Sequence, residues 1–377
     1  MPASELSEIN RVPAKDAKES GTWEKLVQPI AASQGVPTLA DKVAFLSQPQ
    51  AYDARPDSVM PRETHMSWVF LAGDRVYKLK KPVRFSYLDF STLPRREAAC
   101  RAELRLNRRL APDVYLGVVP LIARDGLFSI GGDGPAVEWL VVMRRLDDRF
   151  MLDRMIDERR LSRVHLDRLA DTLARFYRGA DPVFLSPAVH LNDWRKSFND
   201  NKRVLLDPRF CLPPGVVHDI DRVQRHFLRA RGVAIAARIR HRRVIDGHGD
   251  MRPEHIFLGD RVSIIDCLEF NDRLRINDPV DEVAYLSLEC ERLGAPHAGD
   301  YLWRRMKVLL RDGPVDELFT FYRCHRATLR ARLAIAHLYE EHPRTPEKWP
   351  RQCRQYLSLA ARDARRLERM LRRPSGR

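Results

Sequence analysis

Hydrophobic positions follow two different patterns along the chain, and the change falls near residue 147. Before it, "SWVFLAGDRVYKLKKPV" contains two β-rich runs around Ala-Gly-Asp, which predicts a hairpin. The runs "VYLGVVPLI", "GLFSI" and "AVEWLVVMRRL" predict further strands, and the last is expected to be central because it is almost wholly apolar. The segments "TLADKVAFLSQPQAY" and "PRREAACRAELRLNRRLAP" have helical spacing, the first short and the second long.

After residue 147 helical periodicity dominates, as in "LSRVHLDRLADTLARFYRGA", "DIDRVQRHFLRARGVAIAARI" and "DEVAYLSLECERL". The exceptions are two short predicted strands, "RRVID" and "RVSIID", joined by about fifteen residues rich in charged and histidine side chains. The pattern therefore predicts an α+β protein. We expect a polar, flexible leader at residues 1–36, a β-rich part at 37–146 and a larger helical part at 147–377.

Composition limits the class of protein. With 377 residues, 44% of them hydrophobic, the chain is long enough for a large core. No apolar run approaches the ~20 residues that span a bilayer, and the first residues lack the apolar block of a signal peptide, so we expect a cytoplasmic protein with no membrane partner. The six cysteines are scattered without a C-x-x-C pair, which favours reduced, buried thiols over disulfides or structural zinc.

The formal charge of +15 is unevenly distributed. Residues 244–300 hold 13 acids against 5 arginines, a balance of −8, whereas residues 301–377 hold 19 Lys or Arg against 8 acids. The C-terminal arginines recur among Leu and Ala at helical spacing, so they form either the solvated face of an amphipathic helix or a surface that attracts phosphates. The acidic stretch and the lack of aromatics among these arginines disfavour nucleic acid as a partner.

The acidic stretch contains the residues with the clearest chemistry, in "VIDGHGDMRPEHIFLGDRVSIIDCLEF". This segment is a metal site, an acid/base pair, or a polar loop between strands. Asp250 is followed five residues later by His255, and Asp266 ends the next predicted strand. Phosphoryl transfer requires one carboxylate near the acceptor hydroxyl and a second that binds Mg²⁺ beside the phosphates, and this order of residues supplies both.

The segment "HGDMRPEH" followed by "IID" resembles the catalytic segment of the aminoglycoside phosphotransferase and choline kinase group. The resemblance implies a protein-kinase-like bilobal fold, with a small β-rich N-lobe and a larger helical C-lobe, and it implies ATP (or GTP) and Mg²⁺ as cofactors. It makes Asp250 the catalytic base and Asp266 the metal ligand. His255 stands where the family usually has Asn, and a neutral imidazole can also coordinate a divalent ion.

The same resemblance implies a strand lysine that holds the nucleotide phosphates and pairs with a helical glutamate. In "RVYKLKK", Lys78 and Lys80 point to the same face of the strand, and we favour Lys78 because it follows an apolar pair. For the glutamate we favour Glu103 over Glu97, which sits nearly two turns earlier on the predicted helix.

Other expected contacts also come from the resemblance. There is no G-x-G-x-x-G sequence ahead of the hairpin, so the backbone of "THMSW" and the Ser67 hydroxyl would cover the phosphates. Backbone groups from Met143 to Arg145 would contact the adenine. Asp281, in "NDPVDEVAYL", corresponds to an aspartate that supports the catalytic loop, although N-capping of a helix would explain it without chemistry.

The segments "THMSWVFL", "LNRRLAPDVYLGVVPL" and "IIDCLEFNDRLR" further resemble a bacterial aminoglycoside-phosphotransferase-like subfamily. This resemblance covers about residues 38 to 340. Many members carry an added P-loop kinase domain, and the absence of G-x-x-x-x-G-K-[ST] predicts none here. The leading hypothesis is a small-molecule kinase that transfers a phosphoryl group from the nucleotide to a hydroxyl of its substrate. The acidic stretch would suit a cationic acceptor unless its carboxylates are engaged elsewhere. The alternative is a catalytically weak, nucleotide-binding regulatory module that binds an acidic partner.

Overall fold

The protein is represented by a computed structural model that describes residues 37–372 except 86, 125, 314, 341, 342 and 344. The expected leader at residues 1–36 lies outside the described residues. The described chain divides into two compact units. One, here called the sheet unit, contains the described residues up to Met151 together with Glu254–Asp272, and the other, the helical unit, contains Leu152–Pro253 and the described residues from Arg273 onward. The expected domain limits stay predictions.

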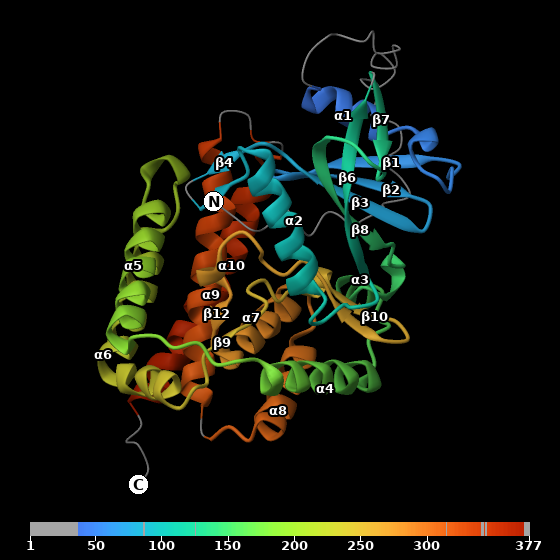
Figure 1. Ribbon diagram of the computed structural model, residues 1–377. Coiled ribbons are helices and arrows are strands. Elements are labelled where there is room, and N and C mark those ends of the chain that lie inside the picture. The colour runs from blue at the N-terminus through green and yellow to red at the C-terminus, as the bar shows by residue number, and fades with distance from the viewer. Residues whose placement is uncertain are drawn as a thin grey trace. The chain divides into compact units, whose positions relative to one another are not determined.

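The sheet unit is built on an antiparallel sheet of six strands in the order β1-β2-β3-β8-β6-β7 (Figure 1). The strands are β1 (Val59–Glu63), β2 (Ser67–Ala72), β3 (Arg75–Lys80), β6 (Tyr115–Arg124), β7 (Leu127–Ile130) and β8 (Ala136–Arg144). The predicted hairpin is present as β2 and β3, and Gly73 in its turn has a φ of +60°, which glycine adopts without strain. As expected for the most apolar run, β8 is interior in the sheet, between β3 and β6.

Alternation along β3 assigns its side chains to two faces of the sheet. Leu79 belongs to a hydrophobic core that it shares with Leu46 of helix α1 (Leu39–Leu46) and with Trp68 and Phe70 of β2. Lys78 and Lys80 point to the other face, where helix α2 (Leu93–Asn107) packs against β6 and β8 (Figure 1). Both predicted helices of this half are therefore present, and each covers one face.

Two short hairpins complete the sheet unit. They are β4 (Arg84–Phe85) with β5 (Leu88–Asp89), and β10 (Ile256–Leu258) with β11 (Val262–Ile264). The predicted strand "RVSIID" corresponds to β11, but its partner β10 was not predicted because three residues are too few to show a period.

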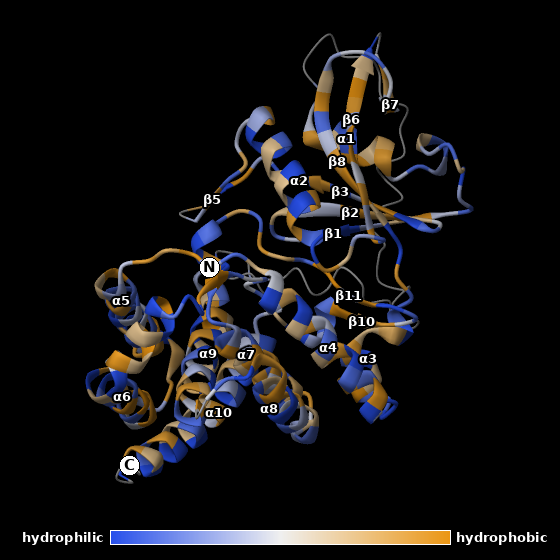
Figure 2. Ribbon diagram, turned by 60° about the horizontal axis from the view of Figure 1, so that its bottom comes forward, coloured by the Kyte–Doolittle hydropathy of each residue, from blue (hydrophilic) through white to orange (hydrophobic). Residues whose placement is uncertain are grey.

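The helical unit confirms the change of pattern after residue 147. Its helices are α3 (Leu152–Asp157), α4 (Arg163–Gly179), α5 (Pro187–Leu205), α6 (Pro214–Arg240), α7 (Pro279–Arg292), α8 (Pro296–Leu310), α9 (Asp316–Ala336) and α10 (Lys348–Leu371). Helix α7 packs against α8 and α9, and α9 packs against α10. Figure 2 shows the mixture of hydrophobic and hydrophilic positions along these helices that amphipathic packing requires. A two-residue strand β9 (Ile245–Asp246), at the predicted strand "RRVID", pairs with β12 (Ile276–Asn277).

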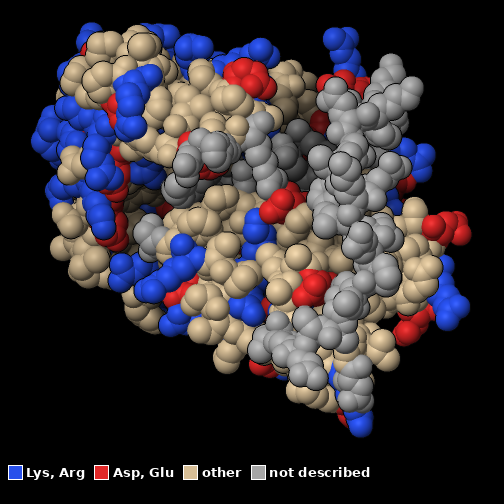
Figure 3. Space-filling view, turned by 90° about the horizontal axis from the view of Figure 1, so that it is seen from above, with Lys and Arg blue, Asp and Glu red and all other residues tan. Residues whose placement is uncertain are grey.

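The arginines from 351 to 369 lie on α10, as expected for an amphipathic helix, whereas Arg373 and Arg377 lie outside the described residues. The six arginines of this helix are exposed, while Cys353, Tyr356, Leu357 and Leu367 are buried. Figure 3 shows Lys and Arg side chains gathered along one edge of the face in view, with acidic side chains among them. A role for these arginines in attracting phosphates stays a prediction.

The six cysteines all lie within the described residues. All six cysteines are free thiols, and five are buried as expected, whereas Cys211 is exposed. Within residues 37–372, apart from the six left out, no helix combines the length and the apolar character needed to cross a membrane.

Candidate active site

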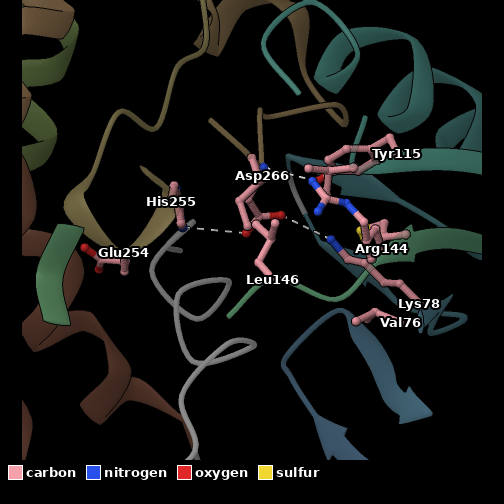
Figure 4. A pocket seen from close by; sticks show the side chains of 11 residues that line it. Val76, Lys78, Tyr115, Arg144, Leu146, Glu254, His255 and Asp266 are labelled. Atoms are coloured by element: carbon pink, nitrogen blue, oxygen red, sulfur yellow. Dashed lines mark hydrogen bonds and ion pairs between the residues drawn. The ribbon is translucent and has the colours of Figure 1, made fainter. Parts of the chain in front are cut away.

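A pocket lies within the sheet unit, between strands β3, β6 and β8 and the residues around the β10–β11 hairpin (Figure 4). Its lining contains four of the predicted site residues, Lys78, Met143, His255 and Asp266. Val76, Val114, Met143 and Leu146 give it an apolar side, and Tyr115, Arg144 and Glu254 add polar groups. A pocket with an apolar wall and a few convergent charged groups is typical of a site for a small molecule or cofactor.

Lys78 joins two acidic residues that are distant in the sequence. Its Nζ lies 2.8 Å from Glu103 Oε1 and 3.2 Å from Asp266 Oδ1, and all three side chains are at least 93% buried. Burial alone would lower the pKa of Lys78, but the carboxylates of Asp266 and Glu103 outweigh it and raise the pKa well above its usual value. The expected ion pair between Lys78 and Glu103 is therefore present, and Lys78 is a permanent cation in the pocket.

Asp266 is held in an uncommon backbone conformation. Its φ is +64°, in the left-handed region that Asp tolerates better than most residues. Two side chains fix this turn, because the Asp266 N–H donates to the Tyr115 hydroxyl at 3.2 Å and the next N–H, of Cys267, donates to Asn107 Oδ1 at 2.9 Å. Backbone strain that surrounding side chains maintain is a feature of functional sites.

Asp266 and His255 form the pair that could hold a metal ion. One oxygen of Asp266 receives a hydrogen bond from Lys78, whereas Oδ2 is buried, has no hydrogen-bond partner, and lies 3.7 Å from His255 Nε2 (Figure 4). In the described part of the chain, no group of three or more His, Cys, Asp or Glu side chains is arranged to hold a metal. Asp266 fits Mg²⁺ bound together with substrate phosphates, because this ion takes one or two carboxylates from a protein and completes its shell with phosphate and water. The imidazole of His255 is a softer ligand beside it.

Asp250 lies in the helical unit, on a loop that helix α7 supports. The N–H groups of His248 and Gly249 both donate to Glu282 Oε1, at 2.7 and 2.6 Å. Gly249 has a φ of +87°, so the turn just before Asp250 requires a glycine. One turn further along α7, the Tyr285 hydroxyl donates to Asp250 Oδ1 at 3.1 Å.

The electrostatic surroundings of Asp250 keep its carboxylate oriented. The Nε atom of Arg252 forms an ion pair with Asp250 Oδ2 at 3.2 Å, and both side chains are at least 96% buried. Burial raises the pKa of Tyr285 well above its usual value, so the phenol keeps the proton that it donates. Both carboxylate oxygens of Asp250 thus face a donor or a cation of the same unit.

The loop is supported by Glu282, and the sequence prediction for Asp281 was wrong. Asp281 instead pairs with Arg326 of α9, with oxygen–nitrogen distances of 2.8 and 2.7 Å. Adjacent helical residues point about 100° apart, so only one of the two carboxylates faces the loop. Gly247 marks that contact, because a Cβ there would lie 2.5 Å from Glu282 Oε1.

Ser67 is not brought to the pocket. It is 1% exposed, lies opposite Lys80 in the β2–β3 register, and is not among the residues that line the pocket. Its backbone N–H donates to Thr64 Oγ1 and its carbonyl accepts from the Thr64 N–H, so neither group is available to a phosphate. Ser67 thus closes the turn between β1 and β2, and the contact of its hydroxyl with the phosphates stays a prediction.

The end of β8 borders the pocket through Met143 and Arg144, and Leu146 follows the strand, whereas Arg145 is not among the lining residues. The N–H groups of Arg144 and Arg145 already donate to the carbonyls of Val114 and Asp74, both at 2.8 Å. A contact from these two residues to a nucleobase would therefore use a carbonyl oxygen rather than an N–H. The adenine contact of Met143 to Arg145 stays a prediction with that restriction.

The acidic stretch at residues 244–300 is largely neutralised inside each unit. In the helical unit the pairs are Asp246 with Arg275, Asp278 with Arg238, Asp281 with Arg326, Glu289 with Arg292, and Glu291 with Arg323. In the sheet unit they are Asp266 with Lys78 and Glu269 with Lys80. The expected attraction for a cationic acceptor therefore loses its basis, since these carboxylates are internal ion-pair partners.

The sequence is similar to those of known mycobacterial proteins. No family model matches the chain. Uncharacterized proteins of Mycobacterium bovis and Mycobacterium tuberculosis are 35% identical to it over 298 residues. That match covers 77% of this chain and 58% of the relatives, so the chain spans little more than half of their length.

Among solved structures, choline kinase from Cryptosporidium parvum superposes with a TM-score of 0.51 at 9% identity, over 87% of this chain and 95% of that one. A choline/ethanolamine kinase family protein from Mesorhizobium loti gives a TM-score of 0.48 at 15% identity, over 85% of this chain and 98% of that one. The superposition on choline kinase shows that the chain has the protein-kinase-like fold. More narrowly, its fold is that of choline kinase, and the resemblance to the aminoglycoside phosphotransferase and choline kinase group is confirmed at the level of fold.

Proposed function

We propose that the protein is a small-molecule kinase that transfers the terminal phosphoryl group of ATP (or GTP) to a hydroxyl of its acceptor, with Mg²⁺. The observation that carries this proposal is the pairing of Lys78 with Glu103 and Asp266 at the pocket of the sheet unit. Lys78 is buried between two carboxylates that are 25 and 188 residues away in sequence, and its ammonium group contributes nothing to hydrophobic packing. It is suited to bind the phosphates of a nucleotide, because its charge is fixed and its position is determined.

We infer a role for each residue from its contacts. Lys78 binds the nucleotide phosphates and Glu103 orients it. The apolar side of the pocket, with Val76, Met143 and Leu146, accommodates the nucleobase. Asp266 and His255 would hold Mg²⁺, which when bound neutralises charge on the phosphates.

Asp250 is the proposed base. Its carboxylate orients the acceptor hydroxyl and takes the hydroxyl proton as the new oxygen–phosphorus bond forms and the bond to the leaving nucleoside diphosphate breaks. Tyr285 and Arg252 hold the two carboxylate oxygens in place, so that the base loses little orientational freedom on reaction. In this reaction most of the rate enhancement comes from position and charge, and little from covalent chemistry on the protein.

The test has two stages, with the whole chain. Binding of ATP and GTP in the presence of Mg²⁺ is measured first, by calorimetry, for the wild type and for Lys78→Met. Polyols, sugars, amino alcohols and aminoglycosides are then screened for acceptor-dependent nucleotide consumption, with Asp250→Asn as the blank. We expect Asp250→Asn to bind nucleotide normally and to lose at least about 10³-fold in turnover.

Two results would contradict the proposal. Wild-type protein that binds no nucleotide would exclude a kinase. Full turnover by Asp250→Asn would show that the base has been assigned to the wrong residue. Nucleotide binding without consumption in the presence of any acceptor would instead favour a regulatory module.

A further inference from the structure

A second lysine of β3, Lys80, is buried beside the first and has a different set of partners. It is 1% exposed, and its Nζ lies 2.6 Å from Glu103 Oε2 and 2.5 Å from Glu269 Oε1. The ring of Phe90 lies 5.0 Å from the same ammonium group. Lys80 does not line the pocket, so its charge is directed entirely at groups of its own chain.

Glu103 connects the two lysines. Its Oε1 accepts from Lys78 and its Oε2 accepts from Lys80, so the carboxylate is held at both oxygens. A carboxylate with one partner can rotate about its last torsion, whereas a carboxylate with two lysines on one strand cannot do so without breaking a contact. The orientation that Glu103 presents to Lys78 therefore depends on Lys80.

The contacts form a row of alternating charges whose ends the backbone joins into a circuit. The row runs in the order Glu269, Lys80, Glu103, Lys78 and Asp266. Its two ends lie three residues apart in the sequence, on the same segment. The circuit links β3, helix α2 and the segment that follows β11. Asp266 is thus held from two directions: directly by Lys78, and through its own segment by Glu269 and Lys80.

We propose that Lys80 and Glu269 are a positioning pair for the nucleotide site: they fix Glu103 and the segment from Asp266 to Glu269, and thereby the geometry of Lys78 and Asp266. This inference rests on the proposed function and adds two residues to it. Lys80 does not touch the nucleotide; its effect passes through Glu103. Glu269 is not a metal ligand; it neutralises Lys80 and ties down the segment that carries the ligand.

The experiment measures binding of a non-hydrolysable ATP analogue with Mg²⁺, together with the thermal unfolding midpoint of each variant. Removal of one partner leaves a buried unpaired charge, so the informative variant is the double substitution Lys80→Met with Glu269→Gln, which removes both charges at similar volume. Its matched control is Lys81→Met with Glu63→Gln, which removes the neighbouring pair at 2.7 Å, where the side chains are 15% and 33% exposed.

We expect the double variant to fold and its dissociation constant for the analogue to rise about tenfold or more, because small displacements of charged site groups have effects of that order. The control should bind within about twofold of the wild type, since more exposed ion pairs contribute little. Lys80→Arg, which keeps the cation, should recover most of the affinity lost in Lys80→Met.

Unchanged affinity in a folded double variant would overturn the inference and leave the proposed function intact. Loss of nucleotide binding in the wild type itself would instead remove the proposed function, and the inference with it. If the double variant does not fold, Glu269→Asp decides the matter. It keeps the charge but shortens the side chain by one methylene, and a folded Glu269→Asp protein with wild-type affinity would also refute a positioning role.

Discussion

The most direct test of the buried circuit is the stability of Glu103→Gln as a function of pH. Burial by itself would raise the pKa of the Glu103 carboxyl, but the ammonium groups of Lys78 and Lys80 outweigh it and lower the pKa from 4.5 to about 2. This difference between the pKa of the carboxyl in the unfolded and in the folded chain corresponds to about 3 kcal/mol of folding free energy at pH 7. Loss of one partner from a buried ion pair independently gives about 3–5 kcal/mol. Because Gln keeps an oxygen that can accept from one lysine, we expect the lower value, about 3 kcal/mol.

The sign of the pH dependence follows from the lowered pKa. The contribution of Glu103 is fully present above about 4.5, the value for the unfolded chain, and is lost as the pH falls towards about 2. Urea unfolding of the wild type and of Glu103→Gln, from pH 7 down to pH 3, should therefore show a difference that is constant at first and shrinks below about pH 4.5.

The control is Glu97→Gln on the same helix. Glu97 forms an i,i+4 pair with Arg101 at 2.7 Å, with side chains 60% exposed for Arg101 and 32% for Glu97. We expect it to cost no more than about 0.5 kcal/mol. A Glu103→Gln variant that loses less than about 1 kcal/mol at pH 7, or whose deficit does not change between pH 7 and pH 3, would refute the assignment of Glu103 as a charged partner of both lysines.

Three further outcomes are expected. Tyr285→Phe should lower kcat about tenfold and leave the KM for the nucleotide unchanged, because it removes one hydrogen bond worth about 1.5 kcal/mol from the proposed base; equal kinetics would contradict that role. His255→Asn should leave the fold intact and raise the activity with Mg²⁺ relative to that with Mn²⁺, because an amide oxygen suits the harder ion. An unchanged ratio of the two activities in a metal titration would argue against His255 as a ligand. Gly247→Ala should lower the thermal midpoint by a change worth about 1–3 kcal/mol, because its Cβ would lie 2.5 Å from Glu282 Oε1, whereas Gly215→Ala, with no atom within 4 Å of its Cβ, should be tolerated.

The fold was predictable where local pattern and burial agree. The hairpin of β2 and β3 was visible in the sequence because its two runs flank a glycine turn, and helix α2 was visible because its apolar positions recur with helical spacing. Strands β10 and β12 could not be predicted from the sequence, because three and two residues are too few to show a period. Such elements form because tertiary contacts hold them, and those contacts have no local signature.

The site was predictable in its residue types and only partly in its pairings. The alternation of β3 correctly places Lys78 and Lys80 on one face, but it cannot tell which of them meets Asp266, 188 residues further on. The prediction that Asp281 supports the catalytic loop failed for the same reason. Both carboxylates begin α7, and only the packing of that helix decides that Glu282 faces the loop and Asp281 faces Arg326.

The charge pattern shows most clearly how sequence and structure differ. Counting charges along the chain yields an acidic stretch and a basic C-terminal region, which look like two surfaces for two partners. The contacts show instead that basic residues of α6 and α9 pair with acids of the stretch, as in Arg238 with Asp278 and Arg323 with Glu291. Buried ions require such partners, because the cost of removing a charge from water exceeds what its neighbours return unless the pairing is close. The acids of the stretch and the arginines that pair with them thus form one internal network of ion pairs. The same requirement explains why Glu103, Asp266 and Glu269 surround the two buried lysines of β3.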